Sequence, residues 1–276
     1  MKKTPARILA AAIALLLAIS LSACGDSFES AMARALSEMQ DVESLHMDMV
    51  MSLDMSLSAE GQTIDLPISM DMSMDTINEP LTAHATMNMN VMQQPVGVEY
   101  YLEQSGENYQ MYANMDGGGW ESMSMDETEL GQFSAVDGVE FYLQCASAFE
   151  KVGEEEVRGA TASRYDGEIP ADMLSEAIER SGAYDMFESL GVSGESTDGL
   201  TSGMGLSIYL DNETGLPVRY VIDMTDLMRE MMDTTLSAVG AGDAMSWEVG
   251  EASVSVTLSD FNGIDAIEIP DYARGA

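Results

Sequence analysis

The pattern that predicts the fold begins at residue 47, where the chain reads MDMVMSLDMSL through residue 57. It recurs as IDLPISMDMSMD at residues 64–75 and as AHATMNMNV at residues 83–91. In all three stretches apolar residues alternate with polar ones. Because side chains switch faces at every residue of a β-strand, such alternation gives each strand one apolar and one polar face. The sequence therefore predicts antiparallel strands of one sheet with a single apolar face.

Methionine supplies most of that predicted face. The chain of 276 residues contains 25 methionines, and ten of them lie between Met47 and Met92. Three interpretations are open: a Cu(I) site, since thioethers suit a soft ion; a deformable wall around a hydrophobic ligand; or ordinary core. Against copper, side chains two apart on one strand lie about 7 Å from each other, too far to share one ion. The residues expected to point inward are Met49, Met51, Leu53, Met55, Leu66, Ile68, Met70, Met72, Met87 and Met89.

The rest of the sequence predicts further strands and a few helices, and no change in its hydrophobic pattern divides the chain into two cores. The predicted strands cover residues 96–103, 109–115, 155–165, 205–224 (a hairpin), 252–260 and 264–269. The predicted helices cover residues 27–41, 137–151, a segment starting at Pro170, and 226–236.

The N-terminus has the features of a secretory leader. Basic residues at Lys2, Lys3 and Arg7 precede an uncharged run, Ile8–Leu21, which is shorter than the roughly 20 residues of a membrane span. The run ends Leu-Ser-Ala-Cys at Cys24, which resembles the bacterial lipobox. That resemblance implies cleavage before Cys24, a diacylglycerol on its thiol and usually a further acyl chain such as palmitate. We therefore expect a signal peptide at residues 1–23, one domain at residues 24–276, and lipid anchoring on the extracytoplasmic face of a cell membrane.

Composition excludes several functions. The chain has 11 Lys and Arg against 48 Asp and Glu, a formal charge of −37, whereas nucleic-acid binding rests on basic charge. It lacks the G-x-S-x-G, H-E-x-x-H, P-loop, G-x-G-x-x-G and C-x-x-C motifs, and its two histidines allow little acid–base or metal chemistry. With Cys24 acylated, Cys145 has no disulfide partner. We expect no enzyme, no cofactor, no bound metal and a monomer.

Several short motifs together resemble a known group of lipoproteins. The lipobox leads into an amphipathic helix and then into alternating strands. Later stretches are VRG at residues 157–159 with Tyr165, DNETGLPVRY at 211–220, and LSDFNG at 258–263 with IEIP at 267–270. This order resembles the LolA/LppX/LprG-like superfamily, especially its Gram-positive branch. The resemblance implies an α+β fold: a single curved antiparallel sheet, or half-barrel, with helices packed on its concave face and a cavity that holds lipid chains.

These expectations combine into one hypothesis. The protein is predicted to bind a lipid or other hydrophobic ligand in a methionine-rich cavity between sheet and helices. The alternative is an envelope interaction or sensory module with the same fold and a filled core. Cu(I) binding is the third hypothesis.

Overall fold

The computed structural model describes residues 27–59, 61–91, 94–106, 108–125, 149–174, 201–238 and 245–275. Most of them lie in strands. The elements in chain order are α2 (Phe28–Met39), β1 (Ser44–Ala59), β2 (Gln62–Asn78), β3 (Leu81–Val91), β4 (Gln94–Ser105), β5 (Asn108–Met115), β6 (Trp120–Met125), β7 (Glu150–Val157), β8 (Ala160–Ile169), the 3₁₀ turn η3 (Ala171–Met173), β9 (Met204–Asp211), β10 (Pro217–Asp223), α7 (Thr225–Ala238), β11 (Met245–Ser259) and α8 (Asp271–Arg274).

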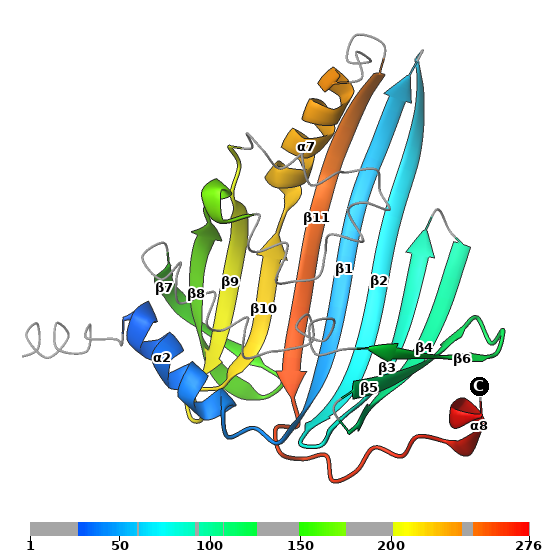
Figure 1. Cartoon of the computed structure of the whole chain (residues 1–276). Coiled ribbons are helices and arrows are strands. Elements are labelled where there is room, and N and C mark those ends of the chain that lie inside the picture. The colour runs from blue at the N-terminus through cyan, green and yellow to red at the C-terminus, as the bar shows by residue number, and fades with distance from the viewer. Residues whose placement is uncertain are drawn as a thin grey trace, which may run out of the picture.

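All eleven strands form one antiparallel sheet, which is not closed. Their order is β6-β5-β4-β3-β2-β1-β11-β10-β9-β8-β7. Two meanders are therefore joined where the last strand, β11, pairs with the first, β1 (Figure 1). The three longest strands, β1, β2 and β11, stand together in the middle of the sheet.

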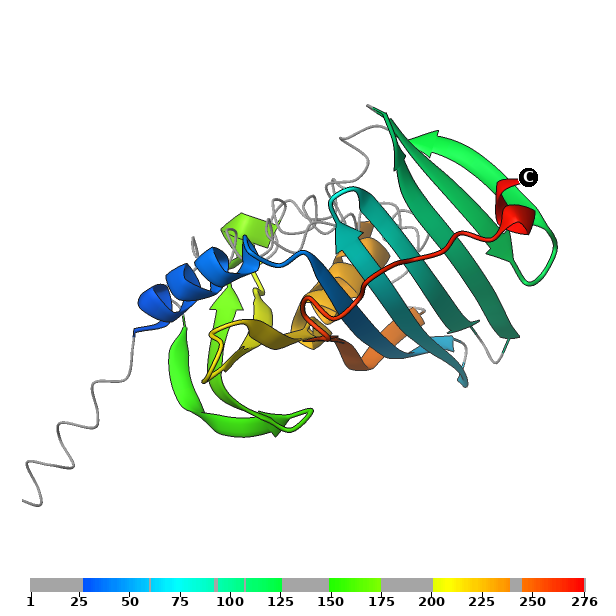
Figure 2. The same cartoon turned by 90° about the horizontal axis from the view of Figure 1, so that it is seen from below.

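The register confirms the predicted alternation. Met49 of β1 lies opposite Met72 of β2 and Val256 of β11, and the polar residues between these positions lie opposite one another on the other face. The β1–β11 pairing shifts by one residue between Asp54 and Met55, where Gly250 is the extra residue. Such a bulge bends a strand. Seen from below, the sheet is strongly curved (Figure 2).

Side chains of two helices and of the apolar face of the sheet form one hydrophobic core. Helix α2 starts at the cap Ser27, whose Oγ accepts a hydrogen bond from the Ser30 amide, and it buries Phe28, Met32, Ala35 and Met39. Helix α7 buries Leu227, Met228, Met231 and Met232. These eight side chains cluster with residues of β1 and β8–β11, such as Leu53, Ile208 and Val249. The fold is thus mostly sheet, with three short helices in the described part of the chain.

Two predicted elements need correction. Residues 264–269 form no strand, although isoleucine and acidic residues share the segment. Strand β1 pairs with β2 on one side and with β11 on the other, so it has no free edge at which this segment could add a strand. The segment instead crosses the polar face of the sheet, where Ile269 and Ala273 pack with Tyr101 and Tyr112. The helix predicted at residues 137–151 is wrong at its end, since β7 begins at Glu150. Its earlier part, including Cys145, lies outside the described residues.

Candidate functional site

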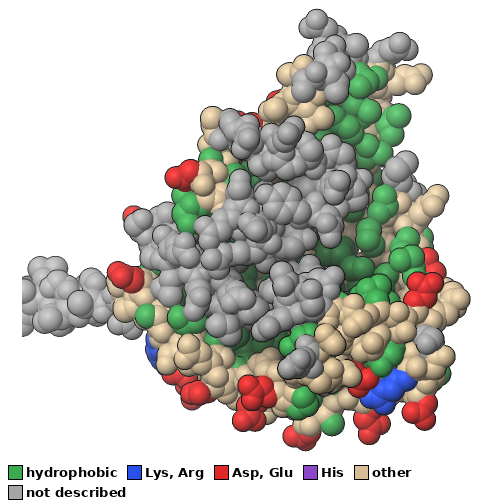
Figure 3. Space-filling view, in the orientation of Figure 1, with side chains coloured by type: hydrophobic (Ala, Val, Ile, Leu, Met, Phe, Trp, Pro, Cys, Tyr) green, Lys and Arg blue, Asp and Glu red, His purple; other side chains and the backbone are tan. Residues whose placement is uncertain are grey.

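Pairing across the sheet brings the ten predicted inward-facing residues onto one surface. One row runs Val98, Met87, Met72, Met49 and Val256 across β4, β3, β2, β1 and β11. The adjacent row runs Val96, Met89, Met70, Met51 and Val254. We call the side of β1–β5 that carries these rows the methionine face. Figure 3 shows hydrophobic side chains gathered along the upper right of the molecule, over the long central strands.

The methionine face has a covered part and a partly open part. Met51, Leu53 and Met55 are 8%, 6% and 9% exposed. Leu53 and Met55 belong to the core that α2 and α7 share with the sheet. The other seven predicted residues keep part of their surface exposed: Met49, Leu66, Ile68, Met70, Met72, Met87 and Met89. Whether this part lines a closed cavity was a sequence-based prediction, and it stays one.

Charge is confined to the opposite side of these strands. At the positions that share a face with Met49, strands β1 to β5 carry no Asp, Glu, Lys, Arg or His. The opposite face carries Asp48, Asp71, Asp75 and Glu99 among others. In a chain with a formal charge of −37, this separation leaves a neutral apolar surface. Such a surface suits an uncharged hydrophobic partner.

Register also changes the geometric argument about copper. Along one strand the methionines are too far apart to share an ion, but pairing places Met49 opposite Met72 and Met51 opposite Met70. Met87 and Met89 continue these pairs on β3. Directly opposed side chains on one face lie about 5 Å apart at Cβ. Six thioethers therefore form one block on three neighbouring strands.

Two hydroxyl groups on the methionine face were not predicted. The Tyr100 hydroxyl lies 3.6 Å from Met74 Sδ and 3.8 Å from Met72 Sδ. Thr76 is 9% exposed, and its hydroxyl is buried without a hydrogen-bond partner in the described structure. Burial raises the pKa of Tyr100 to about 12. The alternation of β2 and β4, continued by one step past Met74 and Val98, places both residues inward.

Both histidines lie on the opposite face and bind carboxylates. The His46 ring is 2.6 Å from Asp75 through Nδ1 and 3.2 Å from Asp48 through Nε2. Burial lowers the pKa of His46, but the hydrogen bonds and negative charges of Asp75 and Asp48 outweigh it, and the pKa is raised. Arg158 donates to Asp48 at 2.8 Å and so ties the β7–β8 turn to β1. In the parts of the chain that the structure describes, no three His, Cys, Asp or Glu residues could hold a metal ion.

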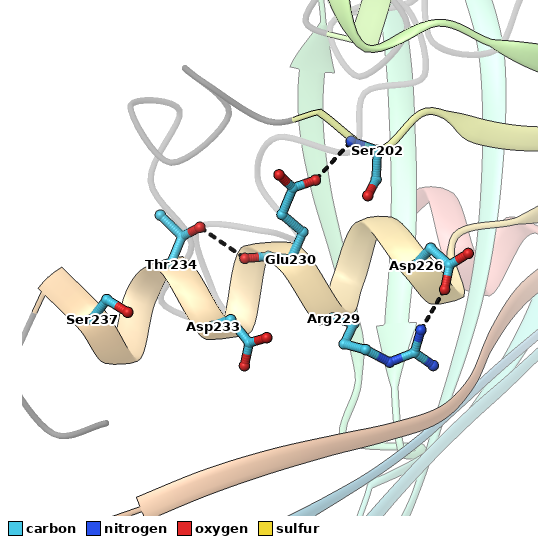
Figure 4. Close-up of a pocket in the computed structure, with 7 residues that line it drawn as sticks. All are labelled: Ser202, Asp226, Arg229, Glu230, Asp233, Thr234 and Ser237. Atoms are coloured by element: carbon cyan, nitrogen blue, oxygen red, sulfur yellow. Dashed lines mark hydrogen bonds and ion pairs between the residues drawn. The ribbon is translucent and has the colours of Figure 1, made fainter. Parts of the chain in front are cut away.

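A polar depression of about 530 Å³ lies elsewhere, against the side of α7 that carries Arg229 and Glu230 (Figure 4). The Glu230 carboxylate accepts hydrogen bonds from the backbone amides of Ser202, at 2.7 Å, and Thr201, at 2.9 Å. These bonds lower the pKa of Glu230 to about 2. The side chains that line the depression are polar, and the Glu230 carboxylate is already hydrogen-bonded to the segment that precedes β9. These bonds attach α7 to that segment, and the depression offers no apolar side chain to a hydrophobic ligand. It is lined by Ser202, Asp226, Arg229, Glu230, Asp233, Thr234 and Ser237.

The proposed anchor cannot be placed on this geometry. Cys24 and the leader at residues 1–23 lie outside the described residues. No helix in the described ranges is long and apolar enough to cross a membrane.

Comparisons with known proteins give a family match and several structural neighbours. Residues 27–137 match a family of unknown function, DUF6612. No curated protein matches the chain. Among solved structures, Mycobacterium tuberculosis lipoprotein LppX is 14% identical with a TM-score of 0.47, over 89% of this chain and 100% of LppX. LprF from Mycobacterium bovis is 12% identical with a TM-score of 0.47, over 89% of this chain and 97% of LprF.

A third neighbour is a domain from Vibrio parahaemolyticus described as an outer membrane lipoprotein-sorting protein. It is 11% identical with a TM-score of 0.22, over 88% of this chain and 98% of that domain. LppX, LprF and this domain are the kinds of protein that the sequence motifs resemble. Nothing in these matches concerns a Gram-positive branch.

Proposed function

We propose that this protein is a membrane-anchored extracytoplasmic lipoprotein that binds a lipid or other hydrophobic ligand on the methionine face, without catalysis. One observation carries the proposal: a face of five strands has no charged residue, and seven of its ten predicted ligand-contacting residues stay partly exposed. Leaving such an apolar surface partly exposed to water adds nothing to the stability of a protein. A hydrophobic guest would cover it.

Methionine suits a guest of variable shape. Its side chain is unbranched and polarizable, so a wall built from it adjusts to chains of different length. Each buried methylene contributes about 0.8 kcal/mol, so an acyl chain with a dozen buried methylenes gains on the order of 10 kcal/mol before ordering costs. No charged group is needed for binding of this kind.

The finer architecture is part of the proposal. Helices α2 and α7 would lie on the concave side of the sheet and cover one end of the ligand. Residues 24–276 would form one domain behind a cleaved leader at residues 1–23. With Cys24 acylated, three residues lie between the anchor and Phe28, so four Cα–Cα steps, or about 14 Å of fully extended chain, separate them. The start of α2 would therefore stay near the bilayer surface.

Native mass spectrometry of the protein purified from its own host tests the proposal, and organic extraction of a second sample identifies any bound lipid. Two variants add the same charge at neighbouring positions of β3: Met87→Asp on the methionine face and Asn88→Asp on the opposite face. Wild type and Asn88→Asp should carry a co-purifying lipid, and Met87→Asp should bind it at least tenfold more weakly. Folding is checked by circular dichroism. A protein without lipid that takes up none in solution would support the alternative of an interaction module with a filled core.

Copper is a second candidate, because the register groups six thioethers on three strands. Titration of lipid-free protein with Cu(I) against a competing chelator separates the two functions. Stoichiometric uptake that is lost on replacing Met49, Met72 and Met87 by leucine would favour copper. We expect no uptake above that of the leucine variant, since leucine preserves the apolar surface and removes the sulfur.

A further inference from the structure

A tyrosine hydroxyl on the methionine face contacts two sulfurs on a strand that is not its neighbour. Tyr100 of β4 lies opposite Ala85 of β3, and Ala85 lies opposite Met74 of β2. Because Ala85 carries only a methyl group, the phenol extends across β3 to β2. Its hydroxyl lies 3.6 Å from Met74 Sδ and 3.8 Å from Met72 Sδ. Tyr100, Met72 and Met74 therefore form one contact group.

The hydroxyl of this group donates only to weak acceptors in the described structure. Both are thioethers, and a thioether is a poor hydrogen-bond acceptor. Burial raises the pKa of Tyr100 to about 12, so the phenol keeps its proton and donates at physiological pH. Oxidation of one sulfur to a sulfoxide would place a polar S–O oxygen beside this donor. The contact group thus already contains the hydrogen-bond donor that an oxidised methionine needs.

The two sulfurs of the contact group differ in their access to solvent. Met74 is only 6% exposed, whereas Met72, two residues away on the same strand, is partly exposed. An oxidant dissolved in water has to reach the lone pair of the sulfur. We therefore expect Met72 to react and Met74 to be protected, although the same hydroxyl contacts both.

We propose that Met72 is a site of oxidation by hydrogen peroxide and that the Tyr100 hydroxyl donates a hydrogen bond to the resulting sulfoxide. The lone pair of Met72 Sδ attacks one peroxide oxygen, the S–O bond forms and the O–O bond breaks. Sulfur gives up two electrons and the peroxide is reduced. The proton on the transferred oxygen passes to the departing hydroxide, which leaves as water.

Oxidation of Met72 would also change the ligand site, and this part of the inference rests on the proposed function. Met72 lies between Met49 and Met87 in one row across three strands. A sulfoxide there puts a polar oxygen on a surface that is otherwise apolar and uncharged. A hydrophobic guest would have to cover that oxygen, which costs free energy that one hydrogen bond from Tyr100 offsets only in part. Oxidation is thus a signal that weakens ligand binding.

Peptide-mapping mass spectrometry tests the modification itself. Lipid-stripped protein is treated with limiting hydrogen peroxide, and the gain of one oxygen is followed at each methionine. Met72 should be oxidised roughly tenfold faster than Met74, and the fully buried Met231 should stay reduced. If Met72 reacts as slowly as Met74 while the exposed Met115 is oxidised, the site is overturned.

Binding of the neutral fluorescent probe N-phenylnaphthylamine tests the effect on the ligand site. Peroxide treatment that oxidises Met72 should weaken probe binding by wild type roughly fivefold, and methionine sulfoxide reductases of both epimer specificities should restore it. Met72→Leu removes the sulfur and keeps the apolar surface, so it should lose less than about twofold. Met74→Leu is the matched control and should respond as wild type does. An equal loss in Met72→Leu and wild type would overturn the assignment.

The role of Tyr100 has a readout of its own in urea denaturation. Oxidation should raise the unfolding equilibrium constant about fivefold more in Tyr100→Phe than in wild type, because the variant cannot donate to the sulfoxide. Tyr101→Phe removes a neighbouring phenol whose hydroxyl donates to Glu99 on the opposite face, and it should respond as wild type does. The same response in Tyr100→Phe and wild type would overturn the assigned hydrogen bond.

The outcomes separate this inference from the proposed function. If reduced wild type binds the probe and Met72 stays reduced under peroxide, the inference is overturned and the hydrophobic site stands. If reduced wild type binds no probe, the proposed function falls and takes the effect on binding with it. The peptide map and the unfolding comparison then still decide whether Met72 and Tyr100 form the oxidation site.

Discussion

Replacing methionines by alanine at three depths tests whether the methionine face is open or packed solid. Met231 of α7 is fully buried in the main core, Met87 lies on the partly open part of the face, and Met123 of β6 is 48% exposed. The chemical change is the same at all three sites. Only the surroundings differ, so the series reports packing directly.

The expected costs follow from burial. Removing a fully buried methionine side chain costs about 2–5 kcal/mol, the lost transfer free energy plus the cavity left behind. We expect about 3 kcal/mol for Met231→Ala. For Met87→Ala we expect less than about 1.5 kcal/mol, because solvent or a ligand already meets part of the side chain. Met123→Ala should fall within about 0.5 kcal/mol of wild type, as surface substitutions do.

Urea denaturation of lipid-free protein followed by circular dichroism gives these free energies of unfolding, provided that the slope with denaturant is the same in all variants. Near-UV and far-UV transitions should coincide, which checks that unfolding is two-state. A cost for Met87→Ala equal to that of Met231→Ala would refute the reasoning. It would mean that the methionine face is a filled core.

Three other predictions concern parts of the fold outside that face. Burial opposes the charged ring of His46, but Asp75 and Asp48 stabilise it more, so the pKa of His46 is raised in the folded protein. This contribution to stability is fully present below pH 6.5 and is lost as pH rises through the folded pKa. NMR titration should place that pKa above 6.5, and a value at or below 6.5 would contradict the two contacts. Glu230 has a folded pKa of about 2, so its contribution to the free energy of unfolding is present above about pH 4.5 and is lost as pH falls towards 2. Urea denaturation of Glu230→Gln at pH 7, 4 and 2 should therefore show a smaller loss of stability with acid than wild type. An equal loss would argue against stabilisation by the hydrogen bonds from Thr201 and Ser202 to Glu230. In the C-terminal segment, Ile269→Ala should cost about 2–4 kcal/mol, because its side chain is buried. Arg274→Ala should cost clearly less, because Arg274 forms an exposed ion pair with Glu103. Equal costs in urea denaturation would contradict this ranking.

The sheet was predictable from sequence where one face is apolar and the other polar. The run from Met47 to Leu57 alternates throughout except at Val50, which is apolar on the polar face, and the structure pairs it residue by residue with β2. The start of β11 was missed because the bulge at Gly250 interrupts the alternation of Trp247 and Val249. Alternation also predicted a strand at residues 264–269, which the structure does not form. An alternating pattern indicates that one side of a segment contacts apolar groups, but it does not indicate whether a sheet edge is free to pair with that segment.

The candidate site was predictable in part. The ten inward-facing residues followed from side-chain parity, and the strand register places them on one face of the sheet. Their contact with a ligand stays a prediction. Thr76 and Tyr100 were not predicted because they are polar residues in an otherwise apolar pattern, although side-chain parity alone places them on the same face. Which inward residues α2 and α7 cover, such as Leu53, depends on contacts between distant segments that no local pattern encodes.

Native mass spectrometry of the protein purified from its host under gentle conditions tests the central claim most directly. The account predicts one stoichiometric lipid or other hydrophobic ligand that is released on unfolding. It predicts the same adduct on Asn88→Asp and its loss from Met87→Asp. A wild-type protein that has only the mass of its own processed chain, and that acquires no lipid when incubated with lipid vesicles, would contradict the account.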